Sequence, residues 1–237
     1  GVRPRVKQEL IGRYGGAREL FFSPIDELKG DGLLTEEERE ALSARRLDAA
    51  LNIIERCEQE GIGILTIQDA AYPRRLAAIY DPPLVLYVRG RLPSIDDLAA
   101  VAVVGTRRAT PYGLKMATRM GYELTRCGAL VVSGLTGGVD AAAAEGALMA
   151  GGSCVGVLGS AIDDRRWGGS LARDVETVGA IVSEYPPGTP GNAAFFRARN
   201  RVTSGLTVAC VVAEAPAKSG ALLFADEALS QGREVFA

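Results

Sequence analysis

The sequence of 237 residues contains no histidine, and this absence excludes a large class of enzyme mechanisms. A chain without histidine has no Ser-His-Asp triad, no imidazole general base and no histidine-ligated metal site. Cysteine is scarce, and none of its four copies belongs to a CxxC pair: Cys57, Cys127, Cys154 and Cys210. Because zinc needs clustered ligands, we expect no metal and no cofactor. The thiols are predicted to be free, in a reducing cytoplasm.

Long apolar runs are also absent, and no stretch of 18 uncharged apolar residues occurs. The sequence therefore predicts no membrane-spanning helix and no membrane partner. The first residues, Gly1-Val2-Arg3-Pro4, have neither the apolar core of a signal peptide nor a starting methionine. We therefore expect the sequence to be part of a longer protein.

Lysine is rare, since only four of the 27 basic residues are lysines. Residues 1–65 carry 10 basic and 13 acidic side chains, and residues 66–237 carry 17 and 16, for a net charge of −2. The whole molecule is thus not basic enough to attract nucleic acid by net charge. The arginines do form local clusters, which suit planar contacts with phosphate: Arg107-Arg108, Arg165-Arg166, and Arg197, Arg199 and Arg201. A GC-rich genome accounts equally well for the total.

Residues 1–65 are predicted to form a small all-helical module. Apolar residues recur at helical spacing before Gly15-Gly16, and Ser23-Pro24 has the form of a helix start. Thr35-Glu36-Glu37-Glu38 has the form of a capping box and opens a helix to about Glu60. The apolar stripe of this helix is Leu42, Leu47, Leu51 and Ile54.

Residues 66–237 are predicted to form an α/β domain with a parallel sheet. After a connector that holds one strand at 84–88, short apolar strands alternate with helices, which is typical of a parallel sheet covered on both faces. The expected strands are 101–104, 130–132, 154–158, 180–182 and 208–212. The expected helices lie near 112–127, 139–150, 170–178 and 220–231.

The loops that follow these strands are rich in glycine, arginine and serine. Ligands of such sheets bind beyond the carboxyl ends of the strands, so these loops are candidate sites. Gly105 and Arg107 follow one strand, and a loop from Ser133 to Asp140 leads into a helix, which is an anion site by geometry. Two other candidates are the segment 196–201 and Ser219-Gly220, before a further helix.

Each of these signals has a simpler explanation: a turn glycine, a solvated charged face, or a helix cap. Phe196 either stacks on a base or packs in the core. Because all of the signals fall on one edge of one sheet, we predict a phosphate-rich ligand. The loop at 133–140 is neither GxGxxG nor a Walker A loop, which argues against a dinucleotide or a nucleoside triphosphate.

Taken together, these segments resemble the DNA-processing protein A family, also called DprA or Smf. The resemblance covers about 170 residues in order and spacing, and it rests on motifs rather than on one loop. They include Asp81-Pro82-Pro83, Val103-Val104-Gly105-Thr106-Arg107, Ser133-Gly134-Leu135, Ser183-Glu184-Tyr185-Pro186-Pro187-Gly188, Arg199-Asn200-Arg201 and Gly232-Arg233. The resemblance implies an extended Rossmann-like domain. The N-terminal module is similar to sterile-alpha-motif or helix-hairpin-helix folds.

The resemblance also implies a function and a site. The family binds single-stranded DNA, loads the RecA recombinase during natural transformation, acts as a homodimer in the cytoplasm and is not known as an enzyme. The DNA-binding residues expected here come from the resemblance together with the arginine clusters. They are Gly105, Arg107, Ser133, Gly134, Arg166, Phe196, Arg197, Arg199, Asn200, Arg201, Ser219 and Gly220.

Several positions depart from the family pattern. An arginine is replaced by Gly137, the family's His-Arg becomes Ala144-Glu145, and Arg197 stands where proline is usual. Losing one arginine and gaining Glu145 should weaken an anion pocket, and Arg197 and Arg166 should offset that loss. The chain stops at residue 237, where family members continue into a final strand and many then carry a winged-helix domain.

Two alternatives stay open from the sequence. A nucleoside-monophosphate phosphoribohydrolase resembles this fold class, with Glu184 as the candidate acid, but the Pro-Gly-Gly-x-Gly-Thr loop of those enzymes is absent. A homodimer contact is expected around Leu222, Phe224, Leu229 and Phe236, although these residues serve equally well as ordinary core.

Overall fold

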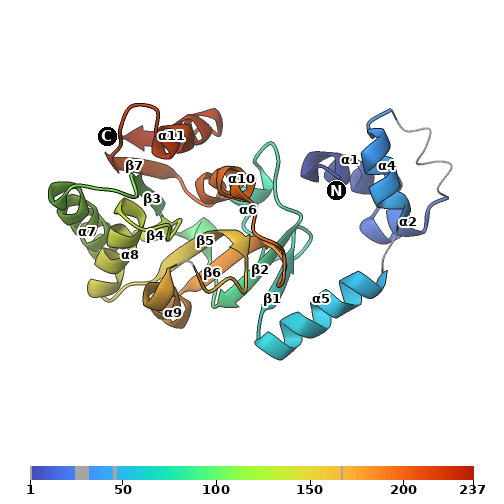
Figure 1. Ribbon diagram of the computed structural model, residues 1–237, viewed down its shortest axis with the longest axis horizontal. Coiled ribbons are helices and arrows are strands. Elements are labelled where there is room, and N and C mark those ends of the chain that lie inside the picture. The colour runs from blue at the N-terminus through green and yellow to red at the C-terminus, as the bar shows by residue number, and fades with distance from the viewer. Residues whose placement is uncertain (1, 25–31, 45–46, 167) are drawn as a thin grey trace.

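The structure is a computed structural model that describes residues 2–24, 32–44, 47–166 and 168–237. One sheet of eight strands organises it, in the order β1-β2-β6-β5-β4-β3-β7-β8 (Figure 1). The strands are β1 (Gly63–Thr66), β2 (Val85–Gly90), β3 (Ala100–Gly105), β4 (Leu130–Ser133), β5 (Cys154–Ala161), β6 (Ala180–Tyr185), β7 (Ala209–Glu214) and β8 (Glu234–Phe236). Strands β3 to β8 are parallel to one another, whereas β1 and β2 join at one edge in antiparallel pairing.

Helices cover both faces of this sheet and precede it, which confirms the predicted α/β class. Those that follow the first strand are α6 (Arg74–Ala77), the 3₁₀ turn η1 (Ile95–Asp97), α7 (Pro111–Arg126), α8 (Val139–Met149), α9 (Gly169–Val178), α10 (Ala193–Gly205) and α11 (Gly220–Ser230). Those that precede it are α1 (Pro4–Tyr14), α2 (Ala17–Phe22), α4 (Glu36–Ser43) and α5 (Leu47–Glu60). No helix within the described residues is both long and apolar enough to cross a bilayer.

The core lies in two layers because successive residues of a strand point to opposite faces. Val132 and Val182 pack on one face with Val202 of α10. Their chain neighbours Val131 and Ile181 pack on the other face, with the small residues of α8 and with α9. The near-continuous apolar strands seen in the sequence are therefore strands buried on both sides.

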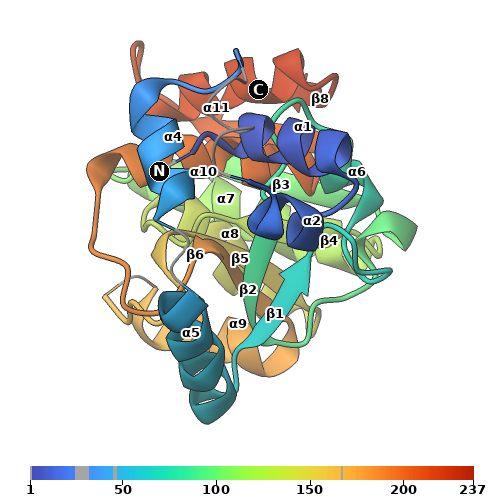
Figure 2. The same cartoon turned by 90° about the vertical axis from the view of Figure 1, so that its right-hand side faces the viewer.

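The predicted helix from residue 36 to Glu60 is wrong in extent, because it is divided into α4 and α5, with residues 45–46 outside the described residues. The apolar residues predicted to form one buried stripe on this helix also fall into two groups. Leu42 packs with the helices α1 and α2, but Leu47, Leu51 and Ile54 are exposed. The face of α5 that is buried, with Cys57, packs instead against the sheet. In Figure 2, α5 lies beside β1, apart from α1, α2 and α4.

No separate range was predicted for α2, β1, α6, the 3₁₀ turn η1, α10 or β8. The proposed domain boundary at residue 65 falls within β1, which pairs with β2. The strand β8 is the edge strand at the end of this chain, at the position where family members were expected to continue into a final strand. The short helix predicted after Ser23 falls mostly on residues 25–31, outside the described residues.

Contacts at the start of α1 join the N-terminal helices to the sheet domain. The backbone N–H of Arg5 donates to Asp81 Oδ1 at 2.9 Å, and the Arg5 guanidinium lies 4.0 Å from the centre of the Tyr80 ring. Asp81 belongs to the Asp-Pro-Pro motif that leads into β2. The motif therefore serves as a contact between the two parts of the chain.

The pairing of α7 with α8 depends on two glycines. A Cβ on Gly121 would collide with the backbone carbonyl of Ala143, and one on Gly146 would collide with that of Thr118. The two helices thus approach backbone to backbone, side by side in Figure 1. This contact supports α8, whose first turn belongs to the site described below.

We predict that Gly146→Ala lowers the free energy of unfolding by about 1–3 kcal/mol, because the added methyl forces the two helices apart. Thermal unfolding followed by circular dichroism measures this change. The control is Gly12→Ala in α1, where a Cβ would meet no atom within 4 Å. There the helix-favouring residue should leave stability equal or higher. An unchanged melting temperature for Gly146→Ala would contradict the close packing.

Candidate functional site

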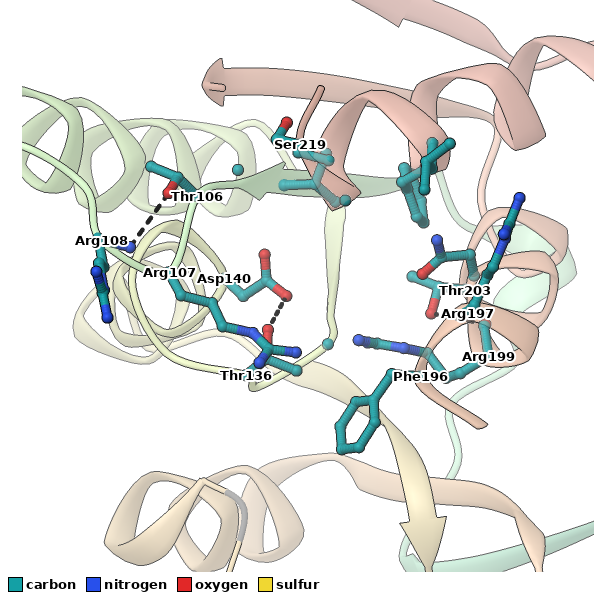
Figure 3. Close-up of a pocket in the computed structure, with 18 of the residues that line it drawn as sticks. Thr106, Arg107, Arg108, Thr136, Asp140, Phe196, Arg197, Arg199, Thr203 and Ser219 are labelled. Atoms are coloured by element: carbon teal, nitrogen blue, oxygen red, sulfur yellow. Dashed lines mark hydrogen bonds between the residues drawn. The ribbon is translucent and has the colours of Figure 1, made fainter. Parts of the chain in front are cut away.

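A pocket of about 540 Å³ opens at the carboxyl ends of β3 and β4, between the loops that follow these strands and the helices α10 and α11 (Figure 3). β3 lies between β4, which follows it in the chain, and β7, which lies on its other side. The order in which successive strands are added therefore reverses between β3 and β7, and such a switch point is where open α/β sheets bind ligands. Nine of the twelve predicted residues line the pocket: Gly105, Arg107, Gly134, Phe196, Arg197, Arg199, Asn200, Ser219 and Gly220.

Glycines at the strand ends allow the pocket walls to approach closely. A Cβ on Gly134 would collide with the Arg199 guanidinium, and a Cβ on Gly105 would lie 2.5 Å from Val139 Cγ2. Gly138 has a φ of +57°, and a Cβ there would collide with the Thr106 carbonyl. The glycine pattern read from the sequence therefore reflects close packing as well as turn formation.

Ser133 supports the pocket from behind and does not line it. Its side chain is fully buried, its Oγ donates to the Asp140 carbonyl at 2.8 Å, and it accepts from the Leu135 N–H at 3.1 Å. Leu135 has a φ of +52°, a left-handed conformation that a leucine rarely adopts. Ser133 thus holds a strained loop against the first turn of α8.

The Arg199 guanidinium is buried at the base of the pocket. Its side chain is 8% exposed, Nη1 donates to the Val157 carbonyl at 3.0 Å, and Nε has no hydrogen-bond partner. Asp140 is buried as well and accepts a hydrogen bond from Thr136 at 2.9 Å. Burial raises the pKa of Asp140, and the charge of Arg199 opposes that rise. Burial likewise lowers the pKa of Arg199, and Asp140 opposes that change. Each charge therefore stabilises the other in a site poor in water.

Arg107 approaches the pocket from the side opposite Arg199 (Figure 3). Its guanidinium carbon lies 5.5 Å from the centre of the half-buried Phe196 ring. The preceding residue, Phe195, stacks on Tyr185 with ring centres 3.8 Å apart, which anchors the first turn of α10. Phe196 is thereby an aromatic surface next to a cation, at the mouth of a polar pocket.

Two helix N-termini and four arginines make the pocket positive. α8 begins after Gly138 and α11 begins after Ser219, whose buried Oγ has no hydrogen-bond partner. The charged side chains among the lining residues are Arg107, Arg108, Arg197 and Arg199, and the single carboxylate Asp140. Because N-terminal N–H groups and guanidinium groups both favour anions, the arrangement suits phosphate.

The structure does not bring Ser133, Arg166 or Arg201 to the pocket. Arg166 is exposed and makes a two-pronged pair with Asp164, with both contacts at 2.8 Å. Arg201 lies two residues after Arg199, and residues of a helix are turned by about 100° each, so it points to another side. There it pairs with Asp81 at 3.1 Å and with Glu184 at 2.7 Å.

Residues not predicted for the site also line it, among them Thr106, Arg108, Thr136 and Thr203. Arg108 was visible as part of an arginine pair, whereas Thr203 carries no signal in the sequence. The residues that depart from the family pattern lie in different parts of the structure. Glu145 is exposed on α8 and does not line the pocket, and Ala144 is in the core. Arg197 lines the pocket, whereas Gly137 follows the lining residue Thr136 and does not line it.

Glu184, the candidate catalytic acid of the alternative phosphoribohydrolase function, is already paired with an arginine. Both oxygens of Glu184 accept from Arg201 Nη2 at 2.7 Å, and Glu184 does not line the pocket. Within the described part of the chain, no three acidic or cysteine side chains are grouped as a metal site.

Comparison with known proteins points to one family. The family described as DNA recombination-mediator protein A matches residues 63–237. DNA processing protein DprA of Bacillus subtilis is 35% identical over 181 residues, which are 76% of this chain and 61% of that protein. Protein Smf of Escherichia coli is 37% identical over 183 residues, 76% of this chain and 49% of that protein. The chain thus spans about half to three-fifths of these relatives.

Two solved structures share the fold. DNA processing protein A from Streptococcus pneumoniae aligns over 98% of this chain and 81% of its own, with a TM-score of 0.81 and 30% identity. The protein of the same name from Helicobacter pylori, reported for its single-stranded DNA binding mode, aligns over 73% of this chain and 79% of its own, with a TM-score of 0.65 and 28% identity. With matches of this extent in both sequence and structure, the chain belongs to the DNA recombination-mediator protein A family.

Proposed function

We propose that this protein binds single-stranded DNA in the pocket between β3, β4, α10 and α11. The observation that carries the proposal is the charge of that pocket: four arginines and two helix N-termini face a single carboxylate. Phe196 adds a surface on which a base can stack. The single-stranded DNA binding mode reported for the Helicobacter pylori relative supports the same ligand.

The shape of the pocket favours a single strand over a duplex. A volume of about 540 Å³ is that of a small-ligand site, so only a short stretch of strand enters. A paired base lies inside the stack and cannot reach Phe196, whereas an unpaired base can. The hydrogen-bond donors of its lining are mainly arginine and threonine side chains, which contact phosphates without regard to sequence. Affinity should therefore depend little on base identity.

The proposed role is a mediator rather than an enzyme. In this role the protein holds the strand in the cytoplasm, loads the RecA recombinase onto it in natural transformation, and breaks no bond. The engagement of Glu184 by Arg201 supports the absence of phosphoribohydrolase chemistry. Stimulation of RecA-driven strand exchange by the full-length protein, with loss of that stimulation in Arg107→Ala, tests the loading step.

We also propose a homodimer, because one small pocket on a chain of net charge −2 gives weak binding. Two pockets on one strand make the second contact intramolecular and raise the apparent affinity by roughly 10²-fold or more. Leu222, Leu229 and Phe236 are exposed around α11 and β8, and are proposed as the contact. Phe224, named with them from the sequence, is buried against the sheet and belongs to the core.

We predict that Arg107→Ala weakens binding of oligo-dT by about 1–3 kcal/mol, the range for a charge-assisted contact. The slope of log affinity against log salt should fall by about 0.7, as expected when one phosphate contact of a single strand is lost. The matched control is Arg126→Ala on α7, an exposed arginine outside the pocket. Equal losses in the two variants, measured by fluorescence anisotropy, would show that Arg107 acts only through net charge.

We predict that oligo-dT binds in preference to a duplex of the same length, and that AMP incubated with the protein yields no free adenine. The first result follows from the stacking surface at Phe196 and the second from the engaged Glu184. A gel shift with duplex competitor and an adenine assay measure them. Release of adenine would favour the nucleotide enzyme, and equal duplex binding would contradict the narrow pocket.

We predict that Leu229→Glu with Phe236→Glu produces monomers of the full-length protein and removes the gain in affinity with longer oligo-dT. A charge on both copies of a two-fold contact repels its partner. The control is Met149→Glu, which changes an exposed apolar residue on α8. Light scattering gives the assembly state. A wild-type protein that is a monomer at micromolar concentration, with affinity independent of strand length, would refute the dimer.

A further inference from the structure

A second pocket, of about 760 Å³, lies between α6, the far end of α10 and the end of α11. It shares no lining residue with the proposed DNA pocket. We call it the α6–α10–α11 pocket, and its charged and amide lining residues are Arg75, Asp81, Arg201, Glu227, Gln231 and Arg233. Three of them, Asp81, Arg201 and Arg233, belong to the motifs on which the family resemblance rests, but the proposed function assigns this pocket no role.

The three arginines of this pocket each keep a buried N–H group that has no acceptor. These groups are Arg75 Nη1, Arg201 Nη1 and Arg233 Nε. A buried donor without a partner costs free energy, and native proteins rarely leave one unsatisfied. Single unsatisfied N–H groups occur at other arginines, such as Arg89 Nε, but at this pocket three lie together, and acceptor oxygens of a ligand would satisfy them once the side chains turn toward it. The DNA pocket has the same signature in Arg199 Nε and Ser219 Oγ.

The carboxylates around the pocket are already engaged by other donors. Asp96 accepts from Arg75 Nε at 3.3 Å, and Asp81 pairs with Arg201 Nε at 3.1 Å. Arg201 Nη2 bonds Glu184, outside the pocket. The remaining lining acid, Glu227, accepts from Gln231 at 3.0 Å. Within the described residues, none of these carboxylates accepts from the three unpartnered N–H groups.

Of the three arginines, Arg233 is the one that pairs with no carboxylate of the described residues. Its Nη2 donates only to neutral carbonyls, those of Arg75 at 3.3 Å and Gly205 at 3.4 Å. Burial lowers the pKa of Arg233, and the charge of Arg75 lowers it further. A bound anion would relieve both effects, because an opposite charge favours the protonated guanidinium.

We propose that the α6–α10–α11 pocket binds a phosphate group through Arg75, Arg201 and Arg233. Phosphate offers several acceptor oxygens in the geometry that guanidinium groups match. Two sources fit: a free phosphate or nucleotide, and a further phosphate of the strand held in the DNA pocket. The second source rests on the proposed function. Arg197 of the DNA pocket and Arg201 of this one are four residues apart on α10, about 6 Å along the helix axis.

The test is a titration of the full-length protein with inorganic phosphate at constant ionic strength, followed by thermal unfolding. A ligand that binds only the folded state raises the melting temperature in a saturable way. We expect that rise in the wild type and in Arg107→Ala, in which the DNA pocket is impaired. Arg75→Gln with Arg233→Gln should weaken the phosphate effect by about tenfold or more. Arg119→Gln with Arg126→Gln, two exposed arginines of α7, is the control of equal charge.

A second variant covers the case in which the double replacement fails to fold. Ser230 is exposed and lines the pocket, so Ser230→Glu supplies a carboxylate to the three arginines. It should fold and lose the response to phosphate. The proposal is overturned if Ser230→Glu or the double variant responds as the wild type does, or if Arg107→Ala alone abolishes the response.

Oligo-dT of increasing length distinguishes the two sources of phosphate. If the strand supplies it, Arg75→Gln with Arg233→Gln weakens binding of long oligo-dT more than of short. If the pocket takes free phosphate, affinity for every length stays at the wild-type value while the phosphate response is lost. If no variant and no wild type binds oligo-dT, the proposed function fails, and the phosphate titration still decides the α6–α10–α11 pocket.

Discussion

The buried guanidinium of Arg199 is the constraint on which the rest of the candidate site depends. A charge removed from water must be partnered, and here the Val157 carbonyl and the nearby Asp140 carboxylate serve that purpose. The position of Arg199 requires glycine at 134, since any side chain there would displace it. Asp140 in turn depends on the first turn of α8, which Ser133 holds.

The sequence predicted most of the sheet and the location of the site, and the reasons are physical. Apolar strands such as 130–132 and 154–158 are buried on both faces, so their runs are unambiguous. α10 was not predicted, because arginines at 197, 199 and 201 alternate with a period of two, which obscures the helix. That period also explains why Arg201 was grouped with Arg199: only helical geometry separates them. Edge strands β1 and β8 are short and partly exposed, so their pattern is weak.

Arg201 has a structural role that the motif alone does not reveal. It pairs with Asp81 and Glu184, and Asp81 also accepts from the backbone of Arg5. Through these contacts α10 is tied to the end of β6, to the loop before β2 and to the N-terminal helices. The two arginines of this short motif thus have different roles: Arg199 lines the proposed DNA pocket, and Arg201 joins the parts of the chain that surround it.

If the proposed pocket binds DNA, the uneven charge of the molecule affects the rate at which the two meet. Since the net charge is −2 while the pocket carries four arginines and one carboxylate, the rest of the chain has a net charge of −5, and positive charge is concentrated at one edge of the sheet. Such a charge dipole turns the molecule as it approaches, so that collisions are weighted toward the productive orientation. The arginines would then act before any contact forms. Their effect on the association rate should fade as salt shortens the reach of the field.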